Sequence, residues 1–174
     1  YNLGSLGFFY NLLIGSLFLV VTASNGIFFL IAWEIMSIAS YFMVVYDRND
    51  KENVKAGLLY LIMTTLGTAF IMLSFLLFYK YTGSFDFAVI KSSIGLIPLS
   101  VRNAIFVFAL IGFGTKAGII PFHIWLPAAH TAAPSHVSAM MSGVMIKTGI
   151  YMMLRIFLDI LQPNAPVWWG LSIL

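Results

Sequence analysis

Long apolar runs separated by short polar segments make up most of this chain. Five of them reach the length of about 20 residues that lets a helix cross roughly 30 Å of hydrocarbon. They cover residues 3–23, 27–46, 54–79, 102–128 and 136–160. The pattern predicts an all-α fold, a polytopic transmembrane helical bundle with five spans.

The segments between the runs carry turn and interface signals. Ser24-Asn25-Gly26 predicts a short turn. Residues 47–55 hold charges of both signs, which indicates a solvated loop that opens the next helix or, alternatively, a docking site for a partner. Residues 80–102 are of intermediate polarity, and the stretch from 84 to 97 predicts a short helix at the membrane interface.

Both ends of the sequence indicate a piece of a larger membrane protein. The chain starts at Tyr1 with no methionine and no signal peptide. A break at residues 162–166 precedes Trp168 and Trp169, an aromatic pair typical of a membrane interface. We expect residues 167–174 to be the start of a further, truncated transmembrane helix.

Composition supports the membrane class and excludes several functions. Of the 174 residues, 61% are hydrophobic and 9% are charged, and the mean hydropathy is +0.98, whereas soluble domains have roughly 25% charged residues. The net charge of +3 gives no reason to expect nucleic-acid binding. Without cysteine, the chain has no disulfide, iron–sulfur cluster or thiolate metal site. Basic residues flank the runs on both sides, so the positive-inside rule leaves the orientation open.

Three ionisable residues lie near the middle of an apolar run: Glu34, Lys116 and Lys147. A charged side chain at this depth is costly and marks an ion pathway. Burial favours neutral lysine, and a nearby carboxylate favours the charged form. A lysine that Glu34 approaches therefore gains a proton, and one that it leaves releases a proton. We interpret the three as a proton relay; the alternative is a structural ion pair plus one snorkelling lysine.

Three histidines are further candidates for the relay, because histidine titrates near neutral pH. His123 and His130 follow Lys116 at i+7 and i+14, which places all three on one face of a continuous helix. His136 and Lys147 are eleven residues apart and also share a helix face. Each histidine is alternatively a hydrogen-bonding residue at the interface. Their spacing does not fit a helical pair of metal ligands, so we expect no metal site.

Pro121 lies inside the fourth run, where it removes a backbone donor and clashes with the carbonyl of Ala117. It predicts a break in the helix between Lys116 and His123. Non-helical backbone at membrane depth survives where it faces protein or water, and transporters use broken helices to build sites at mid-membrane. The alternative is a kink that serves packing alone.

With these residues in view, the chain resembles the antiporter-like proton-channel subunits of respiratory complex I and its relatives. The matching motifs are AWE at 32–34, GTKAGIIPFHIWLPAAH at 114–130 and APSHVSAMMSGVMIKTGIY at 133–151. Together with ASYFMVV at 39–45, the last motif is most similar to the large membrane subunit of energy-converting nickel–iron hydrogenases, of the formate hydrogenlyase and hydrogenase-4 type.

The resemblance implies an antiporter-like fold of two inverted five-helix repeats, each a half-channel, with residues 1–166 as the first repeat. It assigns roles in proton translocation by matching position: Glu34, Lys116, His123, His130 and Lys147, with Pro121 as the residue that breaks the helix. Asn25 departs from the family pattern, which has an acidic residue there in many relatives.

The resemblance also implies a function and partners. The expected function is proton translocation across the cytoplasmic (inner) membrane, coupled to electron transfer on partner subunits of a hydrogenase or complex I-like assembly. The partners would be other membrane subunits and a peripheral redox module with iron–sulfur and nickel–iron centres; this chain would hold no cofactor and perform no redox chemistry. The alternative is a sodium/proton antiporter subunit of a multisubunit cation antiporter. An inert membrane anchor is a third interpretation, but it gives the mid-depth charges no purpose.

Overall fold

The computed structural model describes residues 3–161, 166 and 168–170, and nearly all of these residues are helical. In this part of the chain, five helical segments are long and apolar enough to cross a membrane. They run over Gly4–Thr22, Gly26–Val44, Lys51–Thr82, Leu99–Ala117 and Ser135–Ile160. The predicted all-α bundle of five spans is therefore confirmed. Helices suit this environment because every backbone N–H and C=O inside them is paired within the segment.

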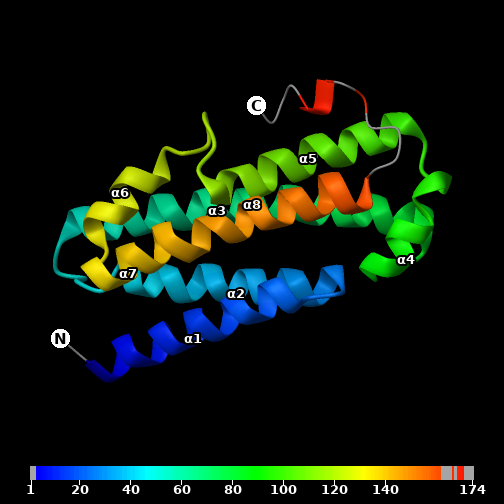
Figure 1. Ribbon diagram of the computed structural model, residues 1–174. Helices are drawn as coiled ribbons and strands as arrows, with labels where there is room; N and C mark the ends of the chain where they lie inside the picture. Colours follow the sequence, from blue (N-terminus) through cyan, green and yellow to red (C-terminus); the bar gives the residue numbers. More distant parts are fainter. Residues whose placement is uncertain (1–2, 162–165, 167, 171–174) are drawn as a thin grey trace.

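The first two spans, α1 (Leu3–Thr22) and α2 (Gly26–Val44), form an antiparallel pair along one side of the bundle (Figure 1). The turn between them is short because Asn25 caps α2. Its side-chain oxygen accepts hydrogen bonds from the N–H groups of Ile27, at 2.9 Å, and Phe28, at 3.4 Å. Capping satisfies two donors that the first turn of a helix leaves free.

The longest helix, α3 (Lys51–Thr82), packs along α5 (Leu99–Ala117). The two backbones meet at a pair of glycines: a Cβ on Gly112 would lie 2.7 Å from the carbonyl oxygen of Gly67. Between α3 and α5 the chain forms two short helices, α4 (Phe87–Ser92) and η1 (Ile94–Leu96). They confirm the short helix expected between the third and fourth spans.

The fifth span is a continuous rod beside α5 (Figure 1). It consists of α7 (Ser135–Met140), the π-helical segment η2 (Met141–Met145), α8 (Ile146–Leu154) and a second π-helical segment, η3 (Arg155–Ile160). A separate short helix, α6 (Trp125–Ala132), connects α5 to this rod.

The fourth run contains the predicted broken helix. It was expected to extend to about residue 128, but α5 ends at Ala117 and residues 118–124 are not helical. The chain thus makes a non-helical crossing of seven positions before α6 begins at Trp125. The third span is longer than predicted. Asp50 caps α3, which therefore begins at Lys51 and not near residue 54.

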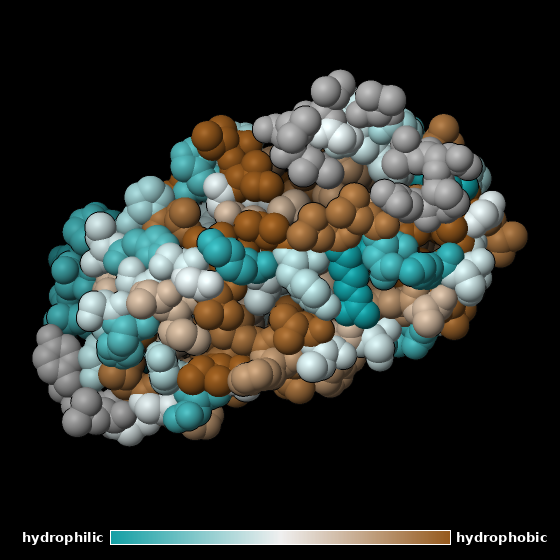
Figure 2. Space-filling model, viewed as in Figure 1, coloured by the Kyte–Doolittle hydropathy of each residue, from teal (hydrophilic) through white to brown (hydrophobic). Residues whose placement is uncertain are grey.

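The bundle buries an aromatic core and exposes apolar side chains outward. Phe29, Trp33, Phe75 and Phe113 lie in mutual edge or tilted contact, with ring centroids 5.2 to 5.8 Å apart. Large apolar side chains such as Phe18, 66% exposed, cover the outer surface. Figure 2 shows hydrophilic residues gathered at the end of the bundle that carries the loop between α2 and α3. This distribution is that of a protein surrounded by lipid.

Some predictions for the C-terminal part are not tested. Residues 162–165, 167 and 171–174 lie outside the described residues, and with them most of the predicted break and of the further helix at 167–174. The division into one repeat over residues 1–166 also stays a prediction. Trp169, expected at an interface, is buried: its ring stacks on Phe106 at 4.8 Å and its Nε1 donates to Asn103 Oδ1 at 3.0 Å.

Candidate functional site

The end of α5 places a lysine beside a gap in the helix. Lys116 lies in the last turn, and Gly118, with φ of 72°, ends the helix in the left-handed region that favours glycine. The N–H of Ile119 donates to the carbonyl of Gly114 at 2.9 Å and closes the turn. Pro121 lies within the non-helical segment that follows, and the peptide bond before it is cis.

Lys116 points into the bundle, where its side chain is 1% exposed. Its Nζ donates to the hydroxyl of Ser37 on α2 at 2.9 Å and to the hydroxyl of Tyr60 on α3 at 2.7 Å. The aromatic rings of Tyr60 and Trp33 lie 4.9 and 5.8 Å from the same nitrogen. The buried amine is thus surrounded by two hydroxyl acceptors and two aromatic rings.

The hydroxyl groups around Lys116 continue into a short network, which we call the hydroxyl cradle: Ser37, Ser40 and Tyr60. The hydroxyls of Tyr60 and Ser40 are 2.5 Å apart, and Tyr60 also contacts the sulfur of Met145 in the fifth span at 3.7 Å. All three cradle residues are almost fully buried. The cradle therefore joins α2, α3 and α5 around one lysine.

Trp125, the first residue of α6 after the break, packs against the hydroxyl cradle. Its Nε1 donates to the carbonyl oxygen of Thr115 at 2.8 Å, one of the carbonyls that the end of α5 leaves free. Its ring lies 5.0 Å from that of Tyr60 in an edge contact. The first residue of α6 thus packs against Tyr60 and gives the last turn of α5 a hydrogen-bond donor.

Glu34 belongs to the same wall of α2, three residues before Ser37, but it does not pair with the lysine in this conformation. No carboxylate oxygen of Glu34 lies within 4.0 Å of Lys116 Nζ. One oxygen, Oε1, is buried and has no hydrogen-bond partner in the described part of the chain. Glu34 still lies close enough to act electrostatically on Lys116 and Tyr60. The expected neighbourhood therefore exists, whereas the expected direct pair is absent.

The histidines are not aligned as the sequence suggested. The shared face of Lys116, His123 and His130 requires a continuous helix, and the break at residues 118–124 removes it. His123 lies in the break, and its buried Nδ1 has no hydrogen-bond partner among the described residues. His130 of α6 pairs through Nδ1 with the hydroxyl of Ser138 at 2.7 Å.

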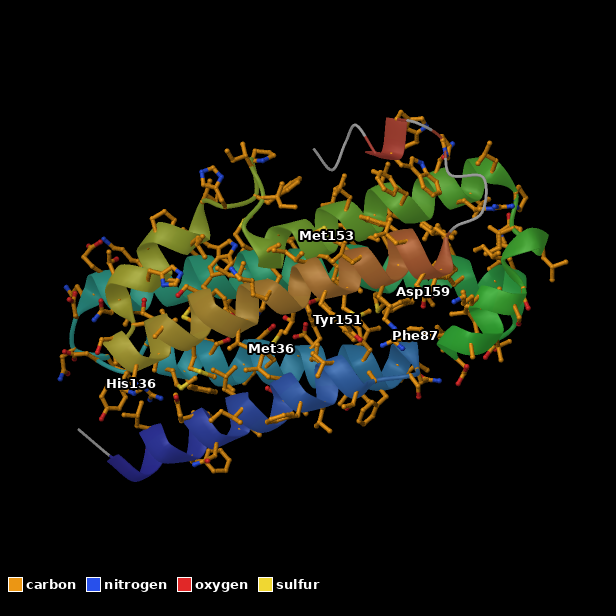
Figure 3. All side chains as sticks on the ribbon, viewed as in Figure 1. Met36, Phe87, His136, Tyr151, Met153 and Asp159 are labelled. Atoms are coloured by element: carbon orange, nitrogen blue, oxygen red, sulfur yellow. The ribbon has the colours of Figure 1, made fainter. Side chains whose placement is uncertain are left out.

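The other two candidates lie on the outside of the fifth span. His136 is exposed, and its ring lies 5.7 Å from that of Tyr10 at one end of the bundle (Figure 3). Lys147 is exposed near the middle of the span, because the adjacent Thr148 and Gly149 face the core. The structure thus does not bring Lys147 to Lys116 within this chain.

Sequence reasoning missed the hydroxyl cradle. The only signal was positional: Ser37 and Ser40 follow Glu34 at about one and two helical turns, and Tyr60 lies inside the next apolar run. For metal binding, the described residues contain no group of three or more potential ligands.

The fold and the site define a class: a polytopic α-helical membrane protein with a lysine buried beside a broken helix. The comparison with known families agrees, since residues 23–174 match the family described as "NADH:quinone oxidoreductase/Mrp antiporter, TM". This chain belongs to that family, and the resemblance found in the sequence motifs is confirmed.

Several individual proteins are similar to this chain. The chain is 43% identical over 171 residues to hydrogenase-4 component B of Escherichia coli K12, covering 98% of this chain and 25% of that protein. It is 33% identical over 164 residues to formate hydrogenlyase subunit 3 of the same organism, covering 94% and 25%. Among solved structures, it superposes on the Mrp complex from Dietzia sp. DQ12-45-1b with a TM-score of 0.83 and 25% identity, covering 92% of this chain and 17% of that one. The chain spans about a quarter of the length of the curated relatives it matches.

Proposed function

We propose that this chain forms a proton half-channel in a membrane subunit of a redox-driven complex. The observation that carries the proposal is Lys116, which is buried at membrane depth with two hydroxyl acceptors while the carboxylate oxygen of Glu34 lies nearby without a partner. A lysine buried inside an apolar bundle is costly to keep, so Lys116 is better explained by proton movement than by folding.

In this proposal Glu34 controls the proton affinity of Lys116 by approaching and withdrawing. The broken helix at Pro121 gives the lysine a polar, deformable neighbourhood. His123 is the first relay after the lysine, because its free buried nitrogen is available for a water or a proton. His130 lies on α6, the next helix after the break, and is a second relay in this proposal, whereas His136 lies on the fifth span at one end of the bundle.

Lys147 has a different place in the proposal. It is exposed on this chain at mid-depth, where lipid would cost a charged lysine about 2.5–3.5 kcal/mol. We infer that protein outside this sequence covers it and receives the proton. Since the chain spans about a quarter of its relatives, the remaining length of such a protein is sufficient for that cover.

The proposed setting follows from the relatives. Hydrogenase-4 component B and formate hydrogenlyase subunit 3 are named as components of hydrogen-metabolising enzymes. By analogy, the parent of this chain would lie in the cytoplasmic or inner membrane beside other membrane subunits, with a peripheral module that holds iron–sulfur and nickel–iron centres. This chain would bind no cofactor and leave the electron transfer to that module.

Replacement of Lys116 by alanine in the full-length protein, within its intact complex in proteoliposomes, tests the proposal. We expect proton translocation to be abolished while the complex still assembles. The matched control is Lys55→Ala, which removes an exposed lysine that pairs with Glu52 at the start of α3. Near-normal pumping by Lys116→Ala would refute the assignment.

The second candidate is a sodium/proton antiporter subunit, favoured by the superposition on the Mrp complex. Exchange of sodium for potassium in the transport assay separates the two functions. The redox-driven half-channel keeps its proton flux in potassium, whereas the antiporter loses it.

A further inference from the structure

Two different sites on α2 can hold the ammonium group of Lys116. Glu34 and Ser37 are three residues apart, which places their side chains on the same helix face about one turn from each other. The structure shows the nitrogen at Ser37 and Tyr60, more than 4.0 Å from either oxygen of Glu34. The lysine side chain is thus seen at the uncharged site, with the charged site left without a partner.

The hydroxyl cradle is oriented to accept hydrogen bonds from the lysine. Ser37 spends its own hydrogen on the carbonyl of Trp33 at 2.9 Å, and Ser40 spends its hydrogen on the carbonyl of Met36 at 2.7 Å. Tyr60 consequently donates to Ser40, and the oxygens of Ser37 and Tyr60 are both left as acceptors for the lysine. Since each hydroxyl has one hydrogen to donate, this polarity follows from the carbonyls below it.

The position of the Tyr60 hydroxyl depends on the helices that pack against it. Ser37 is anchored by α2, and Tyr60 is held between Trp125 from α6 and Met145 from the fifth span. A shift of α6 or of the fifth span therefore moves Tyr60 and changes the uncharged site, whereas Glu34 stays on α2. The balance between the two sites depends on how these helices pack.

We propose that Ser37 and Tyr60 are positioning residues that hold the Lys116 amine away from Glu34, as the second of two stations between which the lysine moves. The inference rests on the proposed function and adds a step to it. The movement of the side chain forms and breaks no covalent bond, and the withdrawal from Glu34 lowers the proton affinity of Nζ. When the lysine amine lies at Ser37 and Tyr60, the Glu34 carboxylate is free to bind another cation. The amine then also lies nearer to the non-helical segment after α5.

Three substitutions in the full-length protein, within its intact complex, test the second station. Tyr60→Phe keeps the ring against Trp125 and removes one acceptor; Ser37→Ala removes the other. Because an acceptor for a buried charged group is lost in each case, we expect protons translocated per redox turnover to fall about tenfold or more. Ser37→Thr restores a hydroxyl at the same place and should recover most of the flux.

The matched control is Ser74→Ala. Ser74 is another fully buried serine in the middle of a span, and its hydroxyl donates to the carbonyl of Ile71 in its own helix at 2.7 Å. It should pump normally. Complex assembly and redox turnover, measured in the same preparations, show whether each variant folds. If Tyr60→Phe does not assemble, the comparison of Ser37→Ala with Ser37→Thr decides.

The outcomes separate this inference from the proposed function. If Lys116→Ala stops pumping while Tyr60→Phe and Ser37→Ala pump normally, the second station is wrong and the half-channel stands. If Ser37→Thr pumps no better than an impaired Ser37→Ala, the hydroxyl is not the acting group and the inference is overturned. If Lys116→Ala pumps normally, the proposed function itself fails.

Discussion

Gly149 of α8 lies directly against Phe113 of α5: a Cβ built on the glycine would be 2.9 Å from the carbonyl oxygen of Phe113. The same Cβ would meet the backbone nitrogen of Ala117 at 3.1 Å. The fifth span therefore touches the backbone of the last turn of α5, the turn that carries Lys116. The position of the buried lysine depends on this close approach of two helices.

Gly149→Ala should destabilise the protein for this reason. A methyl group forced against a backbone carbonyl in a packed interior costs about 1–3 kcal/mol. We expect a lower midpoint of thermal unfolding in detergent and weaker proton pumping, because the end of α5 shifts. Gly143→Ala is the matched control, since a Cβ there has nothing within 4 Å. Equal midpoints for the two variants would mean that α8 moves away from α5 at no cost.

Arg155 of the fifth span contacts both the turn between α1 and α2 and the short helix α4. Its Nη1 donates to the carbonyl of Ala23 at 2.8 Å and to the hydroxyl of Tyr151 at 3.2 Å, and its guanidinium lies over the ring of Phe87 at 4.8 Å. Arg155→Lys keeps the charge but loses the planar group, so the protein should lose about 1.5–3 kcal/mol of unfolding free energy.

The control for Arg155 is the neighbouring ion pair of Lys91 and Asp159, whose side chains are 55% and 53% exposed. Lys91→Ala should change the unfolding free energy by about 1 kcal/mol or less, because exposed pairs contribute little. Both variants are measured by thermal unfolding of the purified protein. A larger loss from Lys91→Ala than from Arg155→Lys would contradict the assignment.

The spans could be predicted from sequence because hydrocarbon demands about 20 apolar residues in a row, and few other structures produce such runs. The break was predictable for the same kind of reason: Pro121 cannot continue a helix. Its exact start was not, since Gly118 ends α5 earlier by adopting a left-handed conformation that a sequence pattern alone does not fix.

The candidate site could be predicted only in part. A charge in an apolar run is visible in the sequence, and Lys116 is indeed buried. The cradle was not visible, because the contact between Ser40 and Tyr60 depends on how α2 and α3 rotate against each other. The outward direction of Lys147 was equally hidden, since it depends on which face of α8 packs on α5.

His123 should matter more for proton flux than His136. The first has a buried nitrogen with no hydrogen-bond partner in the described part of the chain, beside the break that follows Lys116. The second is exposed at the end of the bundle against Tyr10. We expect His123→Ala to lower proton translocation by about tenfold or more, within the range for a lost proton-transfer group. His136→Ala should stay within about twofold, and a loss of about twofold or less in His123→Ala as well would remove His123 from the pathway.

Lys147 faces outward from the fifth span. It is exposed near the middle of the span, where a charged side chain that faces lipid is costly. Lys147→Ala in the full-length protein should lower proton translocation by about tenfold, and Lys147→Arg should stop it nearly as well, because arginine keeps its proton. Lys80→Ala, an exposed lysine in the last turn of α3, is the control. Flux is measured by a pH-sensitive dye in vesicles, per assembled complex; a Lys147→Ala variant that pumps like Lys80→Ala would show that this lysine only faces lipid.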